Sequence, residues 1–240
     1  MNDGELLILA RCAGFVFRAP GFSHPSVPPP VRAGFAFVLS LDLDRAYASR
    51  ALIGPGGFVF ALATEALVGA AIGIAASMLY DGAFSGGRAL DDYVGIRSSV
   101  PSAGVAAGAG FGRLWSLAFT AGFFVLGGYA VALVGFADTF ATLPPGALAS
   151  SQGIETFAVA LPQTLLRAAL FVAGPAIAIA LVAQIALAVV ARLVPRFSTF
   201  TLSFPIVFAC VLVATVAALP LVLRAAAVPW MDLSMLRAGK

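Results

Sequence analysis

The sequence contains very little charge for its 240 residues. Charged side chains make up 10% of the chain, whereas soluble domains contain roughly 25%, and apolar side chains make up 61%. A chain of this composition cannot cover itself with a polar surface, which excludes an ordinary soluble domain. Intrinsic disorder is excluded as well, because disordered segments combine low hydrophobicity with high charge. The sequence therefore predicts a protein of the lipid bilayer or of a hydrophobic assembly.

Residues that usually carry binding or redox chemistry are also scarce. Lys240 is the only lysine, and the net charge of +3 comes from scattered arginines, which is too little for a nucleic-acid groove. The cysteines Cys12 and Cys210 lie far apart in apolar runs, which argues against a disulfide scaffold and against a metal site. The sequence has no phosphate-binding loop, dinucleotide fingerprint, catalytic triad or zinc-protease motif. We therefore expect neither an enzyme nor a cofactor.

What the sequence has instead is long apolar runs. Three runs carry no charge over 24 to 26 residues, and a fourth run of 24 residues contains a single charge, Glu65. A helix of that length measures about 36 Å, which is enough to cross a hydrocarbon core of roughly 30 Å. The four runs predict spanning helices over Gly57–Tyr80, Leu114–Ala137, Ala168–Ala191 and Ser198–Leu223.

Two shorter apolar runs near the N-terminus are interrupted or bounded by charges. Leu6–Phe17 contains Arg11, and Val31–Leu43 has charges near its ends, so both predict buried, re-entrant or interfacial helices. The expected fold is all-α, a multi-helix integral membrane protein with four long hydrophobic helices and two short N-terminal helices. Prolines within or beside the long runs are expected to kink them. Because no internal repeat is visible, we expect one membrane-embedded domain over residues 1–240.

Glu65 is the most unusual residue of the long runs, because it lies about 5 Å from the centre of its run at a helical rise of 1.5 Å per residue. A carboxylate at that depth must be protonated, paired or turned toward a polar interior. It can act as a proton or ion relay, fix a subunit interface, or form a structural pair with Arg11 or Arg167. Arg167 opens an apolar run, so it can also extend to the membrane interface along its aliphatic stem.

A face of small residues follows Glu65 on the same predicted helix. Gly69 and Gly73 form a GxxxG pair, which allows two helix backbones to approach closely in a membrane. The pattern predicts close helix packing, with a partner in the same chain or in another chain. Farther along, glycines and serines interrupt 81–113: its first part can extend the preceding helix, and Ser98–Gly112 is expected to be a flexible loop.

The order of several motifs resembles the FliR/SctT family, the export-gate subunits of bacterial flagella and type III secretion systems. The pattern E-x-x-x-G-x-x-x-G is present from Glu65 to Gly73, and an arginine–proline turn stands between the last two long runs. Arg196 and Ser198 stand where the family commonly has glutamine and asparagine. The similarity extends over roughly residues 5–223 and rests on the order and spacing of motifs that include Leu7–Phe15, Ala19–Phe22, Glu65–Gly73 and Ala191–Pro195.

The resemblance implies a non-enzymatic, structural subunit of the export gate in the bacterial inner membrane, forming part of the helical pore through which unfolded proteins are exported. It also implies FliP/SctR-like, FliQ/SctS-like and FlhB/SctU-like membrane subunits as partners, together with lipid and exported polypeptides. The residues expected to serve helix packing or a subunit interface are Glu65, Gly69, Gly73, Arg11 and Arg167. The residues expected in a gating loop are Gly95, Arg97 and Pro101.

Two other hypotheses remain open from the sequence. The chain can be a small-molecule permease or channel that uses Glu65 as an intramembrane coupling carboxylate, although such proteins normally show paired repeats or several polar groups within their spans. It can also be a membrane scaffold without a transport role. A permease should be stable alone or as a homo-oligomer, whereas an export-gate subunit should aggregate without its partners.

Overall fold

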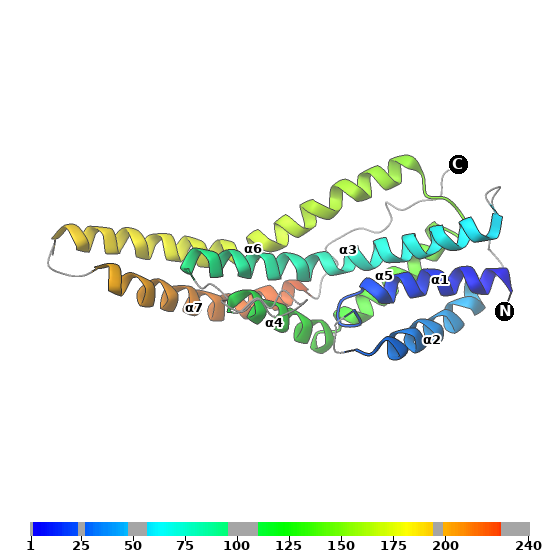
Figure 1. Cartoon of the computed structure of the whole chain (residues 1–240), viewed down its shortest axis with the longest axis horizontal. Coiled ribbons are helices and arrows are strands. Elements are labelled where there is room, and N and C mark those ends of the chain that lie inside the picture. Colours follow the sequence, from blue (N-terminus) through cyan, green and yellow to red (C-terminus); the bar gives the residue numbers. More distant parts are fainter. Residues whose placement is uncertain (1, 24–26, 48–56, 96–109, 194–198, 227–240) are drawn as a thin grey trace. The chain divides into compact units, whose positions relative to one another are not determined.

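The computed structural model describes residues 2–23, 27–47, 57–95, 110–193 and 199–226, and the regular elements within these ranges are seven α-helices (Figure 1). The predicted all-α fold is therefore confirmed. In chain order the helices are α1 (Asp3–Arg18), α2 (Pro29–Tyr47), α3 (Gly57–Val94), α4 (Phe111–Val125), α5 (Gly128–Thr142), α6 (Ser151–Leu193) and α7 (Thr199–Ala226).

The helices group into two compact units, and the division between the units falls inside α3, α4 and α6. Unit 1 takes in Met1–Met78 and Phe123–Thr164, and it contains α1, α2 and α5. Unit 2 takes in Leu79–Gly122 and Leu165–Ala227, and it contains most of α4 and all of α7. The single domain expected from the sequence stays a prediction.

The two short N-terminal helices of unit 1 lie side by side as an antiparallel pair (Figure 1). The first helix begins after Asn2, whose backbone N–H donates to Glu5 Oε2 at 2.9 Å and so satisfies one of the free N–H groups at this end of the helix. With 16 and 19 residues, α1 and α2 are the short helices that the sequence predicts, and neither is among the candidate membrane spans.

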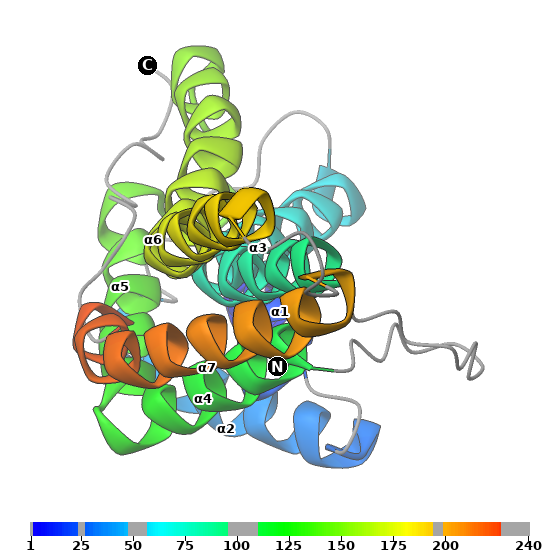
Figure 2. The same ribbon diagram turned by 90° about the vertical axis from the view of Figure 1, so that its left-hand side faces the viewer.

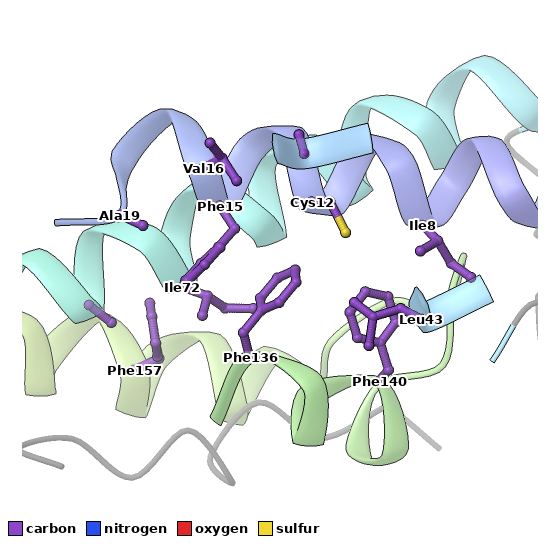
Figure 3. Close-up of a cluster of buried hydrophobic side chains, with 12 residues drawn as sticks. Ile8, Cys12, Phe15, Val16, Ala19, Leu43, Ile72, Phe136, Phe140 and Phe157 are labelled. Atoms are coloured by element: carbon purple, nitrogen blue, oxygen red, sulfur yellow. The ribbon is translucent and has the colours of Figure 1, made fainter. Parts of the chain in front are cut away.

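The core of unit 1 lies between α1, α3 and α5 and is rich in phenylalanine (Figure 3). Phe136 of α5 stacks on Phe15 of α1 with their ring centroids 4.3 Å apart, and it meets Phe140 edge to face at 5.4 Å. Such offset and edge-to-face pairs stabilise a core beyond the area that the rings bury. Ile72 of α3, Leu43 of α2 and Phe157 of α6 pack on the same cluster, so five helices share one core.

Within the ranges that the structure describes, three helices are long and apolar enough to cross a membrane, namely α3, α6 and the part of α7 over Phe204–Leu221. α3 has 38 residues and ends at Val94, which confirms that the first part of the 81–113 segment extends the preceding helix. α6 has 43 residues and begins at Ser151, well before the apolar run predicted as a span. Pro162 and Pro175 lie within α6, and Pro205 and Pro220 lie within α7; kinks at these prolines stay a prediction.

The run Leu114–Ala137 is not one continuous helix, so this part of the prediction is corrected. α4 ends at Val125 and α5 begins at Gly128, and the two helices are bent by 72° at the break. Gly127 takes a left-handed conformation with φ of 78°, which an L side chain rarely adopts and which ends α4. The described residues therefore contain three candidate spans, or four if the bent pair counts as one span.

In unit 2, α7 runs back along the second part of α6 in the opposite direction (Figure 1), and the end-on view shows that it crosses α6 at an angle (Figure 2). α3 packs closely on α6, because a Cβ added at Gly82 or Gly86 would lie 2.6 Å from a backbone oxygen of α6. Phe111 of α4 meets Phe208 of α7 with ring centroids 5.7 Å apart. Small residues and aromatic rings thus pack the helices of this unit.

Candidate functional site

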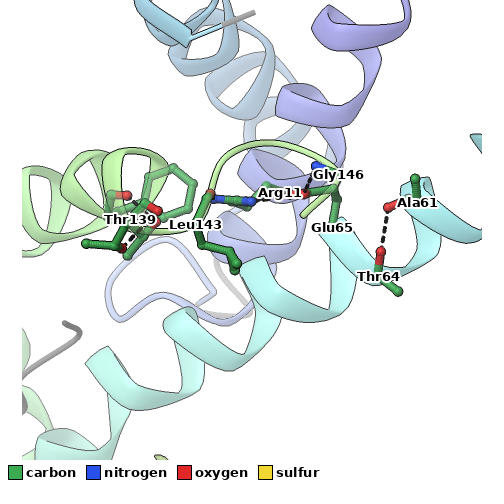
Figure 4. Close-up of polar contacts among 9 residues, drawn as sticks. Arg11, Ala61, Thr64, Glu65, Thr139, Leu143 and Gly146 are labelled. Carbon is green, nitrogen blue, oxygen red and sulfur yellow. Dashed lines mark hydrogen bonds and ion pairs between the residues drawn. The ribbon is translucent and has the colours of Figure 1, made fainter. Parts of the chain in front are cut away.

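The candidate site is a buried ion pair in unit 1 that joins α1 to α3. Arg11 lies in the middle of the apolar face of α1 and is 0% exposed, and Glu65 lies two turns into α3 and is 1% exposed. The Nε and Nη2 atoms of Arg11 donate to the two carboxylate oxygens of Glu65, the second at 2.9 Å (Figure 4). This two-pronged contact matches the planar guanidinium to the planar carboxylate and is among the strongest polar contacts that proteins form.

The third prong of the arginine reaches the end of α5. Arg11 Nη1 donates to the carbonyl oxygen of Leu143 at 2.9 Å (Figure 4). The last carbonyls of a helix have no partner within the helix and carry partial negative charge, so a buried cation is well placed there. The guanidinium also lies over the ring of Phe140, 4.3 Å from its centroid. Arg11 is therefore held by Glu65 of α3 and by the C-terminal end of α5.

The turn after α5 supplies a further donor to Glu65. The backbone N–H of Gly146 donates to Glu65 Oε1 at 2.6 Å. Pro144, Pro145, Gly146 and Ala147 form a tight turn, in which the Ala147 N–H donates to the Pro144 carbonyl at 3.0 Å and Gly146 has φ of 81°. Proline followed by a left-handed glycine is typical of a type II turn. This turn holds the Gly146 N–H against the carboxylate.

The glycine face after Glu65 packs on α1 of the same chain. A Cβ at Gly69 would collide with the backbone carbonyl of Arg11, and a Cβ at Gly73 would lie 2.7 Å from the Phe15 carbonyl oxygen. From the other helix, a Cβ at Gly14 would collide with the Ala66 carbonyl. The two backbones therefore touch over about two turns of α3, from Ala66 to Gly73. This approach brings Arg11 within reach of Glu65.

The other predicted site residues lie elsewhere. Arg167 is exposed on α6 in unit 2, and the partners of Glu65 in the described part of the chain are Arg11 and Gly146. Gly95 follows α3 with φ of 85° and is exposed. Arg97 and Pro101 lie outside the described residues. The structure thus brings together Arg11, Glu65, Gly69 and Gly73 in unit 1, whereas Arg167 belongs to unit 2.

Sequence reasoning missed the backbone partners of the pair, the carbonyl of Leu143 and the N–H of Gly146. Almost every residue type has the same backbone N–H and C=O groups, so residue identity does not reveal which of them bind a side chain. Only the local sequence pattern of the turn was informative. The sequence Pro144-Pro145-Gly146, directly after an apolar helix, favours a tight turn with a left-handed glycine. It does not indicate which side chain the turn will meet.

Cys12 lies next to this pair on α1 and is expected to be chemically inert. Burial raises the pKa of its thiol to about 12, with the neighbouring Arg11 charge acting in the opposite direction. The thiol therefore stays protonated at pH 8, and the nucleophilic thiolate is absent. With Cys210→Ser leaving Cys12 as the single thiol, we expect no maleimide labelling of the native protein at pH 8 and full labelling after denaturation. Labelling of the native protein at the rate of a free cysteine would contradict this geometry.

These features define a multi-pass helical membrane protein in which a buried ion pair and touching glycines hold the helices together. The family model described as "Bacterial export proteins, family 1" matches residues 5–231, so the chain belongs to this family, the FliR/SctT family. The resemblance seen in the sequence is confirmed. Comparison with curated proteins gives no match.

Membership in the family establishes the general role of the chain. It is a membrane component of the export apparatus of flagellar or type III secretion systems, located in the bacterial inner membrane. It is not an enzyme, and it belongs to a multi-subunit export complex.

Proposed function

We propose that the chain is a structural subunit of the export gate and forms part of the helical pore through which unfolded proteins leave the cytoplasm. The observation that supports this role most directly is that Glu65 forms structural contacts inside the protein. Its carboxylate accepts bonds from Arg11 and from Gly146 and is buried, so it holds three segments of chain together. The single charge of the apolar run Gly57–Tyr80 thus stabilises the packing of unit 1.

The same observation gives no support to the permease alternative. A coupling carboxylate must exchange its partner for a proton, ion or solute during transport, and it therefore needs an accessible side. Glu65 is 1% exposed, and its two oxygens already face the guanidinium of Arg11. We therefore do not propose a solute pathway through Glu65.

The outward face of α2 supports the proposal of heteromeric partners. Val31, Val38 and Leu41 are 58%, 63% and 53% exposed on this helix, which is not a candidate span. An exposed apolar face on a helix of a multi-subunit apparatus is suited to packing against another subunit. We propose FliP/SctR-like, FliQ/SctS-like and FlhB/SctU-like membrane proteins as those subunits and exported polypeptides as the substrates.

We further propose that the gating segment expected from the sequence, with Gly95, Arg97 and Pro101, acts in the passage of these polypeptides, and that both units work as one export-gate domain. Gly95 follows α3 in a left-handed conformation, which ends the helix at the start of this segment. Substitutions at Arg97 and Pro101 that change export without changing assembly would support the gating role.

The proposed function is tested by isolating the tagged chain from its native membrane in mild detergent and identifying co-purifying proteins by mass spectrometry. We expect FliP/SctR-like and FliQ/SctS-like proteins, because an export-gate subunit does not cover its apolar faces alone. The expressed chain without these partners should aggregate. A stable homo-oligomer without such partners would contradict the proposal, and a chain unrelated to export purified from the same membrane serves as the control for unspecific capture.

A further inference from the structure

Asp91, near the end of α3 in unit 2, has a buried side chain, whereas the neighbouring Asp92 is exposed. The carboxylate of Asp91 accepts two backbone hydrogen bonds from the start of α4. The Phe111 N–H donates to Oδ1 at 2.7 Å, and the Gly112 N–H donates to Oδ2 at 3.1 Å. The first N–H groups of a helix have no partner within the helix and carry partial positive charge. Asp91 therefore caps α4 from a different helix.

Gly110 explains why the cap of α4 comes from α3. Its carbonyl accepts the first bond of the helix, from the Leu114 N–H at 3.0 Å, so it occupies the position where serine, threonine, aspartate or asparagine normally caps a helix with its own side chain. Gly110 has no such side chain and has φ of 92°, and a Cβ added to it would collide with the carboxylate of Asp91. The glycine leaves the space that Asp91 fills.

The backbone of the same aspartate also accepts a hydrogen bond at the C-terminal end of α3. The Gly95 N–H donates to the backbone carbonyl of Asp91 at 2.9 Å, which closes the last turn of the helix. One turn earlier, Gly87 lets the two helix backbones touch, because a Cβ there would lie 2.6 Å from the Cα of Gly112. The end of α3 and the start of α4 are thus joined at one residue, with its carbonyl on one side and its carboxylate on the other.

We infer that Asp91 is a positioning residue for the start of α4, because its carboxylate and its carbonyl join the start of α4 to the end of α3 at one point. The inference rests on the proposed function, in which Gly95, Arg97 and Pro101 belong to the gating segment. Breaking this contact would leave a buried carboxylate without donors and buried N–H groups without an acceptor. Both states cost free energy, so the folded protein keeps the contact. Loss of the carboxylate releases the start of α4 from the end of α3.

The test compares Asp91→Ala with Asp92→Ala in the full chain, co-expressed with its partner subunits in the native membrane. The second variant removes the same charge at the same helix end but no hydrogen bond from α4, so it is the matched control. Three readouts are needed: complex yield on native gels, export of a secreted reporter, and hydrogen exchange at Phe111 and Gly112. For Asp91→Ala we expect faster exchange at both amides by about tenfold or more, as for the loss of a hydrogen bond to a charged group. Export should fall by a similar factor with the complex intact, and Asp92→Ala should behave as wild type.

Two further variants keep the test decisive if Asp91→Ala fails to assemble. Asp91→Asn retains one acceptor oxygen, so its effects on exchange and export should be intermediate. Gly110→Ala places a methyl group against the carboxylate and should reproduce Asp91→Ala. Normal export from an assembled Asp91→Ala complex overturns the inference. Failure of all three variants to assemble overturns it as well, because Asp91 would then have a purely structural role.

Arg97→Ala and Pro101→Ala separate the inference from the function on which it rests. If these variants alter export and Asp91→Ala does not, the positioning role is wrong and the gating segment stands. If none of the three alters export, the gating proposal itself fails. If Asp91→Ala alone alters export, Asp91 acts by another route than the connection, and the inference is overturned.

Discussion

Replacing Glu65 with alanine is expected to lower the free energy of unfolding of unit 1 by about 3–5 kcal/mol, because it leaves Arg11 buried without its counter-charge. The loss extends beyond the pair, since the Gly146 N–H loses its acceptor in the same substitution. Most folded domains are stable by only about 5–15 kcal/mol, so this loss is a large part of the total stability. The measurement is the unfolding midpoint in detergent, together with the amount of protein that accumulates in the membrane.

The control for this substitution is Glu155→Ala, which removes an exposed carboxylate from α6 in the same unit and should leave stability unchanged. The double variant Arg11→Met with Glu65→Leu provides a second control. Removing both charges together leaves no unpaired ion, so the double variant should be more stable than either single variant. Additive losses in the double variant would show that the two side chains act independently, which would contradict the geometry of the pair.

The sequence was sufficient to predict that Glu65 needs a partner, but not to choose it. The reason is that a carboxylate in an apolar run requires a cation or a proton wherever the helix lies, whereas the identity of the cation depends on which helices touch. Arg11 and Arg167 were equivalent on that basis. Arg11 is the partner because Gly69 and Gly73 let α1 lie directly on α3, and the two charged residues are 54 positions apart in the chain.

The break between α4 and α5 could not be predicted from hydropathy, because the apolar run continues through it without a charge. A helix end needs only a change of backbone conformation, and here Gly127 provides it with φ of 78°. The pair Gly127-Gly128 was the available signal, since adjacent glycines favour a turn. The role of Asp91 was hidden for a related reason: capping by a residue 20 positions away leaves no local pattern near α4.

Replacing Gly69 with leucine is expected to separate α1 from α3 and to abolish both the ion pair and assembly of the export complex. A Cβ at this position already collides with the Arg11 carbonyl, which is backbone and cannot move aside as a flexible side chain would. Gly73→Leu should act in the same way, since its Cβ would lie 2.7 Å from the Phe15 carbonyl oxygen. Overpacking in a close contact typically costs about 1–3 kcal/mol, and here the loss of the Arg11–Glu65 contact adds to that cost. Native gels and unfolding in detergent measure the two effects.

Gly34 makes this prediction specific to close packing, because it is a glycine inside a helix of the same unit with open space around it. No heavy atom lies within 4 Å of a Cβ added there, so Gly34→Ala should be neutral or should stabilise α2 by about 0.5–1 kcal/mol. Gly69→Ala and Gly34→Ala therefore make the same chemical change, but the first is expected to lower the free energy of unfolding and the second to leave it unchanged or raise it. If both are neutral, the contact between α1 and α3 is looser than the structure shows, and the packing that brings Arg11 to Glu65 must have another origin. If Gly69→Ala alone lowers both stability and complex yield, the glycine face is what holds the ion pair in place.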